Sequence, residues 1–198
     1  MTLELWNTFA TFGTFIVIGA TAIVALVQLR HARGSNQIAA IAELHDASQT
    51  PQFTAAEHLV RTELQSRLRD PEFCYQVAKQ DARTPENQAF LANVRGVGNY
   101  YEAMGLLVKT RLVDRDIALN LWSSNAPAMW DRLTSYVALR RRELGDTLYE
   151  NFEYFVVLSQ DWVASHPKGA YPASVRRIAL KDEWLEADTQ YAVSRARA

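Results

Sequence analysis

The sequence predicts an all-α protein with one N-terminal transmembrane helix followed by a multi-helix, bundle-like soluble domain. Three observations support this fold class. A run of about 20 uncharged, mostly apolar residues, Thr8–Val27, has the length of a membrane-spanning helix. Beyond it, apolar residues recur at helical spacing, and no useful stretch alternates with the period of two that a half-buried strand requires. Residues that start and stop helices separate the successive periodic segments.

The apolar run is expected to remain in the membrane as an anchor. Residues 1–7 contain no Lys or Arg, so the basic region that precedes the core of a signal peptide is missing. Arg30, His31 and Arg33 follow the run, and basic residues are retained on the cytoplasmic side. We therefore expect the N-terminus outside and the C-terminal domain in the cytoplasm. Trp6, Arg30 and Arg33 are expected to be anchors at the membrane interfaces.

One side of the expected membrane helix carries small or hydrogen-bonding side chains. Such side chains let helices approach closely and bond to one another, which predicts a partner helix. Alternatively, the threonines bond back to the carbonyls four residues earlier in their own helix. The sequence leaves both explanations open. This polar stripe comprises Asn7, Thr11, Thr14, Thr21, Ala25 and Gln28.

The expected domains are residues 1–33, the anchor with its flanks, and residues 34–198, one helical cytoplasmic domain. The second part is long enough to bury a substantial core. The formal net charge is −1, with 21 Lys plus Arg against 22 Asp plus Glu, so nucleic-acid binding is not expected. Cys74 is the only cysteine, which excludes an internal disulfide and agrees with a reducing cytoplasm.

The soluble domain is expected to begin with two helices. Gly34 and Ser35 either interrupt the membrane helix or only soften it, and Ser35 is placed to cap a short helix that runs to Pro51. Apolar residues at helical spacing over residues 53–64 predict the second helix.

Two N-cap and proline pairs, Asp70-Pro71 and Thr84-Pro85, predict the next helix starts. The helix after Thr84 is expected to be long. Gly98 and Gly105 lie on its apolar face, where the missing side chains allow another helix to approach closely.

The second half of the domain is expected to hold three further helices and a tail. Asp114 is placed to cap a helix that ends near residues 123–125, and Pro127 opens the next helix, which stops at Gly145. Another helix follows from Leu148 to near Pro167. The tail beyond it can hold a last helix packed across the others, with a frayed end.

No metal or other cofactor is expected. The four histidines are scattered, and none pairs with another His or Cys at the spacing of a metal site. These histidines are His31, His45, His58 and His166.

Arg140 interrupts the apolar stripe of its helix and therefore needs a partner. Glu102 and Glu153 are the carboxylates that we expect to form a structural ion-pair cluster with it. Alternatively, these acids and Asp131 form a polar pocket for a ligand or for acid–base catalysis. The structural interpretation is favoured because no nucleophile or glycine-rich phosphate loop accompanies them, so an enzyme is not expected.

Several segments together resemble family 4760 of the bacterial domains of unknown function. The residues that carry the resemblance are Asn99–Val108, Leu112–Asp114, Leu121, Trp122, Trp130, Arg140 and Tyr149–Tyr154. The resemblance implies one N-terminal membrane helix, a helical domain and a place in the bacterial inner membrane, and it supplies no activity. Arg111 stands where this family commonly has a glycine, so a different turn is expected there.

The leading functional hypothesis is a single-pass accessory or scaffold subunit. Its helix and its helical domain would dock on other transmembrane subunits, with the lipid bilayer as a second partner. A membrane-tethered ligand sensor or enzyme that uses the Glu102, Arg140 and Glu153 cluster is one alternative. A homo-oligomeric signalling anchor, in which the polar stripe pairs with its own copy, is another.

Overall fold

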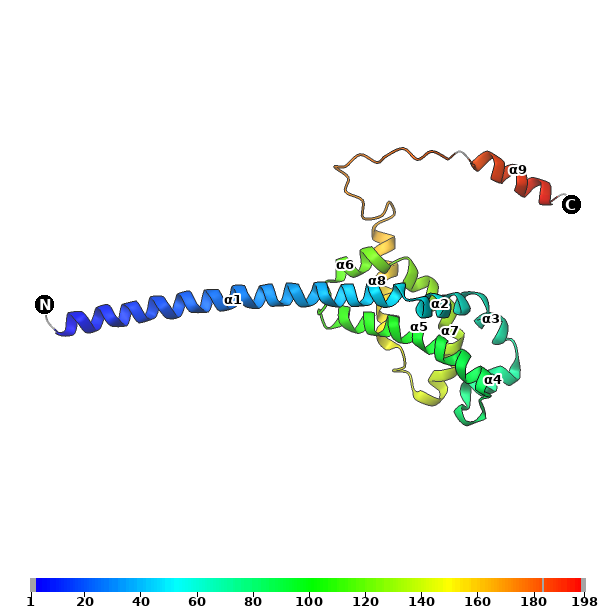
Figure 1. Ribbon diagram of the computed structural model, residues 1–198, viewed down its shortest axis with the longest axis horizontal. Coiled ribbons are helices and arrows are strands. Elements are labelled where there is room, and N and C mark those ends of the chain that lie inside the picture. The colour runs from blue at the N-terminus through cyan, green and yellow to red at the C-terminus, as the bar shows by residue number, and fades with distance from the viewer. Residues whose placement is uncertain (1–2, 183, 197–198) are drawn as a thin grey trace. The chain divides into compact units, whose positions relative to one another are not determined.

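The computed structural model describes residues 3–182 and 184–196, and over these residues the chain is all-helical (Figure 1). The side chains of residues 1–17, 19–20, 33 and 185 are also outside the description. The chain divides into two compact units, Met1–Pro167 and Lys168–Ala198. The first unit holds α1 (Leu3–Gln49), α2 (Pro51–Thr62), α3 (Leu64–Arg67), α4 (Pro71–Ala78), the 3₁₀ turn η1 (Gln80–Ala82), α5 (Pro85–Lys109), α6 (Arg115–Trp122), α7 (Asn125–Leu144) and α8 (Glu150–Ser165). The predicted all-α, bundle-like class is confirmed.

The second unit contains α9 (Leu185–Ala196) after a segment without regular structure. The tail therefore holds a helix, but later in the chain than predicted, because the expected helix contains Val175, Ile178 and Trp184, which all precede α9. Its predicted packing across the other helices stays a prediction.

Helix α1 runs through Gly34 and Ser35 without a break, so these residues do not interrupt the helix. Its last turns pack on the bundle, where Leu44 is buried and Ala40 and Ile41 are partly buried. Over the part of the chain that the structure describes, no helix combines the length and the apolar character needed to cross a bilayer. The side chains of most of the predicted span, Thr8–Val27, lie outside that part.

Three predicted helix starts, at Asp70, Thr84 and Asp114, are confirmed because each cap residue makes its expected local bond. The start predicted at Ser35 is wrong, since α1 is continuous there. Asp70 Oδ1 accepts the N–H of Glu72 at 2.9 Å, and Thr84 Oγ1 accepts the N–H of Asn87 at 3.2 Å. The side chain of Asp114 accepts two backbone N–H groups of α6 in the same way. These bonds satisfy donors that a helix start would otherwise leave without a partner.

Helix α7 also ends as predicted. Gly145 has φ +87, a conformation that favours glycine, and its N–H donates to Arg141 O at 2.9 Å. The start of α7 differs slightly from the prediction. The helix begins at Asn125, so Pro127 lies inside its first turn, where a missing N–H costs no helical bond.

The core forms where α8 crosses α5. Gly98 and Gly105 permit this contact, as predicted: a Cβ at Gly98 would meet the Tyr149 ring, and one at Gly105 would meet the backbone of Asn151. In the space between the two helices, Tyr101 stacks on Phe152 with ring centroids 4.8 Å apart. Trp130 of α7 also contacts Phe152, with ring centroids 5.0 Å apart and the two rings nearly perpendicular.

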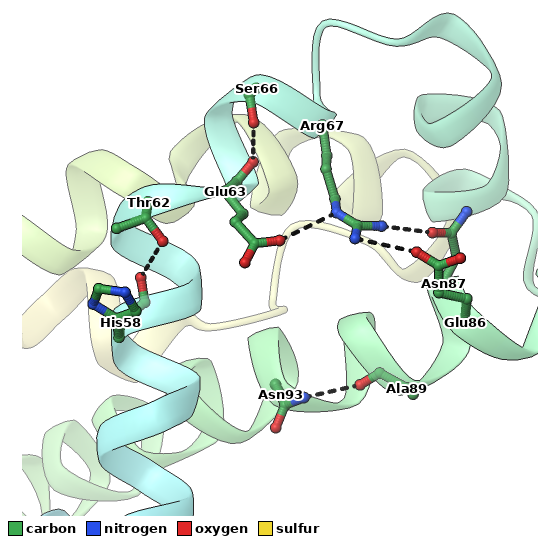
Figure 2. A network of polar contacts seen from close by, with 9 residues as sticks. All are labelled: His58, Thr62, Glu63, Ser66, Arg67, Glu86, Asn87, Ala89 and Asn93. Atoms are coloured by element: carbon green, nitrogen blue, oxygen red, sulfur yellow. Dashed lines mark hydrogen bonds and ion pairs between the residues drawn. The ribbon is translucent and has the colours of Figure 1, made fainter.

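Arg67, at the end of α3, ties that helix to the start of α5 (Figure 2). Its guanidinium donates to Asn87 Oδ1 at 3.1 Å and to Glu86 Oε1 at 3.3 Å. It also lies over the ring of Phe90, 4.3 Å from the centroid. Glu63 contributes a looser ion pair at 3.7 Å. Because the guanidinium is only partly exposed, this network positions the α2–α3 corner against α5.

Candidate functional site

The structure distributes Glu102, Arg140 and Glu153 over three separate contacts, and among the described residues no ion pair joins them. The residue beside Arg140 is the one that meets Glu153: Arg141 Nη2 lies 2.6 Å from Glu153 Oε2. Neighbouring residues on a helix point about 100° apart, so only one of the two arginines can face α8. The expected single cluster is therefore corrected to three local contacts.

Glu102 caps the start of α8 from the middle of α5. Its Oε2 accepts the backbone N–H of Phe152 at 2.8 Å, and its Oε1 accepts Nδ2 of Asn151 at 2.7 Å. A carboxylate at this place also suits the positive end of the α8 dipole. Both carboxylate oxygens of Glu102 are thus occupied by hydrogen bonds to the start of α8.

Arg140 is buried, with 6% of its area exposed, and it binds the last turn of α4. Its Nη1 donates to Val77 O at 3.0 Å and lies 3.9 Å from Glu143 Oε2. Arg83 donates to the same carbonyl at 3.0 Å and to Gln76 O at 2.9 Å. Two guanidinium groups at a helix C-terminus are favoured by the dipole. Burial lowers the pKa of Arg83, and the nearby charge of Arg140 lowers it further.

The predicted polar stripe and interfacial anchors lie on α1. Thr21, Ala25 and Gln28 of the stripe and Arg30 of the anchors are exposed. The side chains of the other stripe and anchor residues lie outside the described part, namely Trp6, Asn7, Thr11, Thr14 and Arg33.

A cavity of about 280 Å³ lies where the end of α1 meets α2, α5 and the α6–α7 corner. Aromatic residues from three elements contribute to its walls: Phe53 of α2, Tyr100 and Tyr101 of α5, and Trp122 of α6. The ring centroids of Phe53 and Tyr100 are 4.6 Å apart. Leu121 and five polar residues complete the lining, and the polar residues are His45, Ser48, Gln49, Glu57 and Asn125. We refer to this space as the α1-end cavity.

Tyr100 is the unusual residue of the α1-end cavity. It is 9% exposed, and its buried hydroxyl lacks a hydrogen-bond partner of normal geometry among the described residues. Burial raises the pKa of this phenol, the nearby side chains of Ser48 and Trp122 lower it in part, and the charge of Glu57 raises it further. Since Ser48, Trp122 and Glu57 all line the cavity, the hydroxyl lies within reach of cavity groups. A buried polar group without a partner is costly, and a bound ligand is one way to satisfy it.

Sequence reasoning missed this cavity because its residues come from distant parts of the chain. Glu57 shows only an ordinary helical ion pair with Arg61, at 2.9 Å. Tyr100 is followed by Tyr101, and such an aromatic pair is typical of a hydrophobic core. Among the described residues, no group of three or more His, Cys, Asp or Glu could hold a metal ion.

Comparison with known protein families shows which family the chain belongs to. The family described as "Domain of unknown function (DUF4760)" matches residues 15–159, more than half of the chain. The chain belongs to the DUF4760 family. No curated protein and no solved structure matches it.

The DUF4760 match covers α2 to α7, part of α1, and most of α8. It therefore includes the contact between Glu102 and Phe152, which joins two of the segments that carry the sequence resemblance. It also includes the residues of the α1-end cavity. The second unit, from Lys168 onward, lies outside the match.

Proposed function

We propose that this DUF4760 protein is a single-pass, membrane-anchored accessory subunit, not an enzyme, in which α1 docks on other transmembrane helices. In this proposal residues 8–27 span the bacterial inner membrane, the N-terminus lies outside and the helical domain lies in the cytoplasm. The uncharged run followed by Arg30 and Arg33 supports the anchor and its orientation.

The observation that carries the proposal is the continuity of α1. The same helix that holds the apolar run ends against the bundle, where Leu44 is buried. A partner that binds the polar stripe would therefore be coupled to the domain through one helix. The bonds of Glu102 and Arg140 support this role, because both side chains are occupied by helix ends.

Membrane attachment is tested by fractionation of cells that express the full chain. We expect the protein to stay in the membrane pellet after an alkaline carbonate wash. A variant with both Ile16→Lys and Ile23→Lys should be released, because each charge in the bilayer costs about 3 kcal/mol. Release of the unsubstituted chain by the same wash would refute the anchor.

Lateral docking is tested by changing the polar stripe. Thr14→Leu combined with Thr21→Leu should abolish co-purification of a partner from native membranes, since the interhelical bonds are lost. Phe12→Leu combined with Ile23→Leu, on the opposite side of the helix, is the matched control and should retain the partner. Equal retention by both variants would contradict docking through the stripe.

The alternative of a homo-oligomeric anchor rests on the same stripe. It is distinguished by Thr21→Cys in a Cys74→Ser background. A disulfide between identical chains in membranes would favour self-association over a different partner.

Orientation is tested in the same background with Ser194→Cys. A membrane-impermeant maleimide should label this cysteine only after the cells are permeabilised. Labelling of intact cells would place the C-terminal part outside.

A further inference from the structure

The α1-end cavity has the composition of a site for a small organic cation. Its wall includes one carboxylate, Glu57, and its lining contains no Lys or Arg. The permanent side-chain charge in this lining is therefore negative, which favours a cationic ligand over an anionic one. Hydroxyl and amide oxygens from Ser48, Gln49 and Asn125 add hydrogen-bond acceptors.

Aromatic residues make up much of the remaining wall. Phe53, Tyr101 and Trp122 join Tyr100 there. Aromatic rings attract ammonium groups through their negative faces, most strongly where water is excluded. The wall therefore combines aromatic rings with polar groups, and a volume of about 280 Å³ suits only a small molecule.

Glu57 retains acceptor capacity toward the cavity. Arg61 binds its Oε1 at 2.9 Å, and no other hydrogen bond to the carboxylate occurs among the described residues. Arg61 itself does not line the cavity. Burial makes the largest contribution to the raised pKa of Tyr100 and of Tyr101, and the charge of Glu57 raises both pKa values further. The charge of Glu57 therefore acts on the aromatic wall.

We propose that the α1-end cavity binds a small organic ammonium ion, with the carboxylate of Glu57 and the aromatic wall holding its charge and the Tyr100 hydroxyl as a hydrogen-bond partner. Because this hydroxyl is buried, the Tyr100 side chain would turn toward the ligand on binding and gain the partner that it lacks. The ligand would contact the end of α1 through Ser48 and also α5 and α6, so it would stabilise the joint between α1 and the bundle.

The ligand is expected to come from solution rather than from the bilayer. His45 lies 18 residues beyond Val27, and α1 is helical over this stretch. At 1.5 Å per residue this is about 27 Å along the helix. If Val27 marks the membrane edge, as proposed above, lipid headgroups lie out of reach of the cavity.

The experiment uses the full chain in a maltoside detergent, which carries no amine. Binding of choline, of ethanolamine and of 3,3-dimethylbutan-1-ol, the uncharged isostere of choline, is measured by ligand-observed NMR. At least one amine should bind about tenfold more tightly than the neutral alcohol, because the alcohol has the shape without the charge. Equal affinity for the alcohol, or no binding of either amine up to about 10 mM, would overturn the proposal.

Two substitutions locate the binding site. Glu57→Gln keeps the shape of the side chain and should weaken amine binding about tenfold, whereas Glu63→Gln, outside the cavity, should leave it unchanged. Tyr100→Phe should weaken ethanolamine more than choline, because only the primary ammonium has N–H donors for the hydroxyl. Tyr75→Phe, at an exposed tyrosine outside the cavity, is its control. Unchanged binding by Glu57→Gln would place the amine elsewhere and refute the site. The comparison of amine with alcohol uses the unsubstituted chain and so does not depend on any variant.

Discussion

The carboxylate of Glu102 accepts the backbone N–H of Phe152 at 2.8 Å, so a residue in the middle of α5 caps the start of α8, 50 positions later in the chain. The residue that precedes α8, Tyr149, has φ +59 and provides no side-chain cap bond. A helix start leaves several N–H groups without partners, and here another helix supplies the acceptor. The bond therefore fixes the position of α8 along α5 as well as its first turn.

Removing the Glu102 carboxylate should destabilise the domain. Glu102→Ala is expected to cost about 2 kcal/mol, because the buried N–H of Phe152 loses its acceptor. Glu102→Gln should cost less, since one amide oxygen can keep one of the two bonds. Urea unfolding of the detergent-solubilised chain measures both values. Glu86→Gln, at a carboxylate that is 79% exposed, is the control and should change stability by no more than about 0.5 kcal/mol.

Three glycines of α5 should respond to alanine in a fixed order. A Cβ at Gly96 meets nothing within 4 Å, so Gly96→Ala should stabilise the helix by about 0.5 to 1 kcal/mol. A Cβ at Gly98 would press on the Tyr149 ring, which must shift. A Cβ at Gly105 would collide with the backbone of Asn151, which cannot move without separating α8 from α5. Unfolding midpoints should rank Gly96→Ala first and Gly105→Ala last, and a Gly105→Ala variant of normal stability would contradict the close approach.

Those features that depend on neighbouring residues were predictable from the sequence. The caps at Asp70, Thr84 and Asp114 bond to groups two or three residues away, so the neighbouring residues are enough to predict each bond. Gly98 and Gly105 also signalled the contact of α5 with another helix, because their spacing keeps both on one face.

Features that depend on tertiary placement were not predictable. The need of Arg140 for a partner was visible, but its partners are a carbonyl 63 positions away and Glu143 on the next turn. The α1-end cavity joins residues from 45 to 125, and each of them has an ordinary structural explanation when it is read alone. A single sequence carries no signal that brings these residues together.

Arg111 occupies a backbone conformation that suits glycine better. It has φ +59 just after α5, where the N–H of Leu112 donates to Leu107 O at 2.9 Å and closes the helix end. Arg111→Gly should therefore stabilise the protein by about 0.5 to 1 kcal/mol, because the left-handed conformation strains a side chain. Arg142→Gly, in the last turn of α7, should destabilise it by about 1 kcal/mol. Thermal unfolding compares the two, and effects of the same sign would refute the strain at Arg111.

A double-mutant cycle should separate the two neighbouring arginines of α7. Arg141→Gln and Glu153→Gln should show a coupling of about 0.2 to 1 kcal/mol, since their charged groups lie 2.6 Å apart at a partly exposed site. Arg140→Gln and Glu153→Gln should be additive in the free energy of unfolding. Coupling in the second cycle instead of the first would restore the cluster that the sequence predicts.

The Lys79–Glu143 ion pair, 2.6 Å long, should make stability depend on pH at both ends of the range. The hydrogen bond from Lys79 lowers the pKa of Glu143 and raises the pKa of Lys79. A carboxylate whose pKa is lower in the folded state stabilises the protein above its unfolded pKa, near 4.3, and this stabilisation is lost as the pH falls through the folded pKa. A lysine whose pKa is raised stabilises the protein below about pH 10.4 and loses this contribution as the pH rises through the folded pKa.

The stability difference between the unsubstituted chain and Glu143→Gln should thus be present at neutral pH and shrink in acid. The difference for Lys79→Met should shrink in alkali. Urea midpoints across the pH range measure both differences, and Glu43→Gln, at an exposed glutamate of α1, should show neither trend. A Glu143→Gln difference that grows on acidification would mean that the pair does not form.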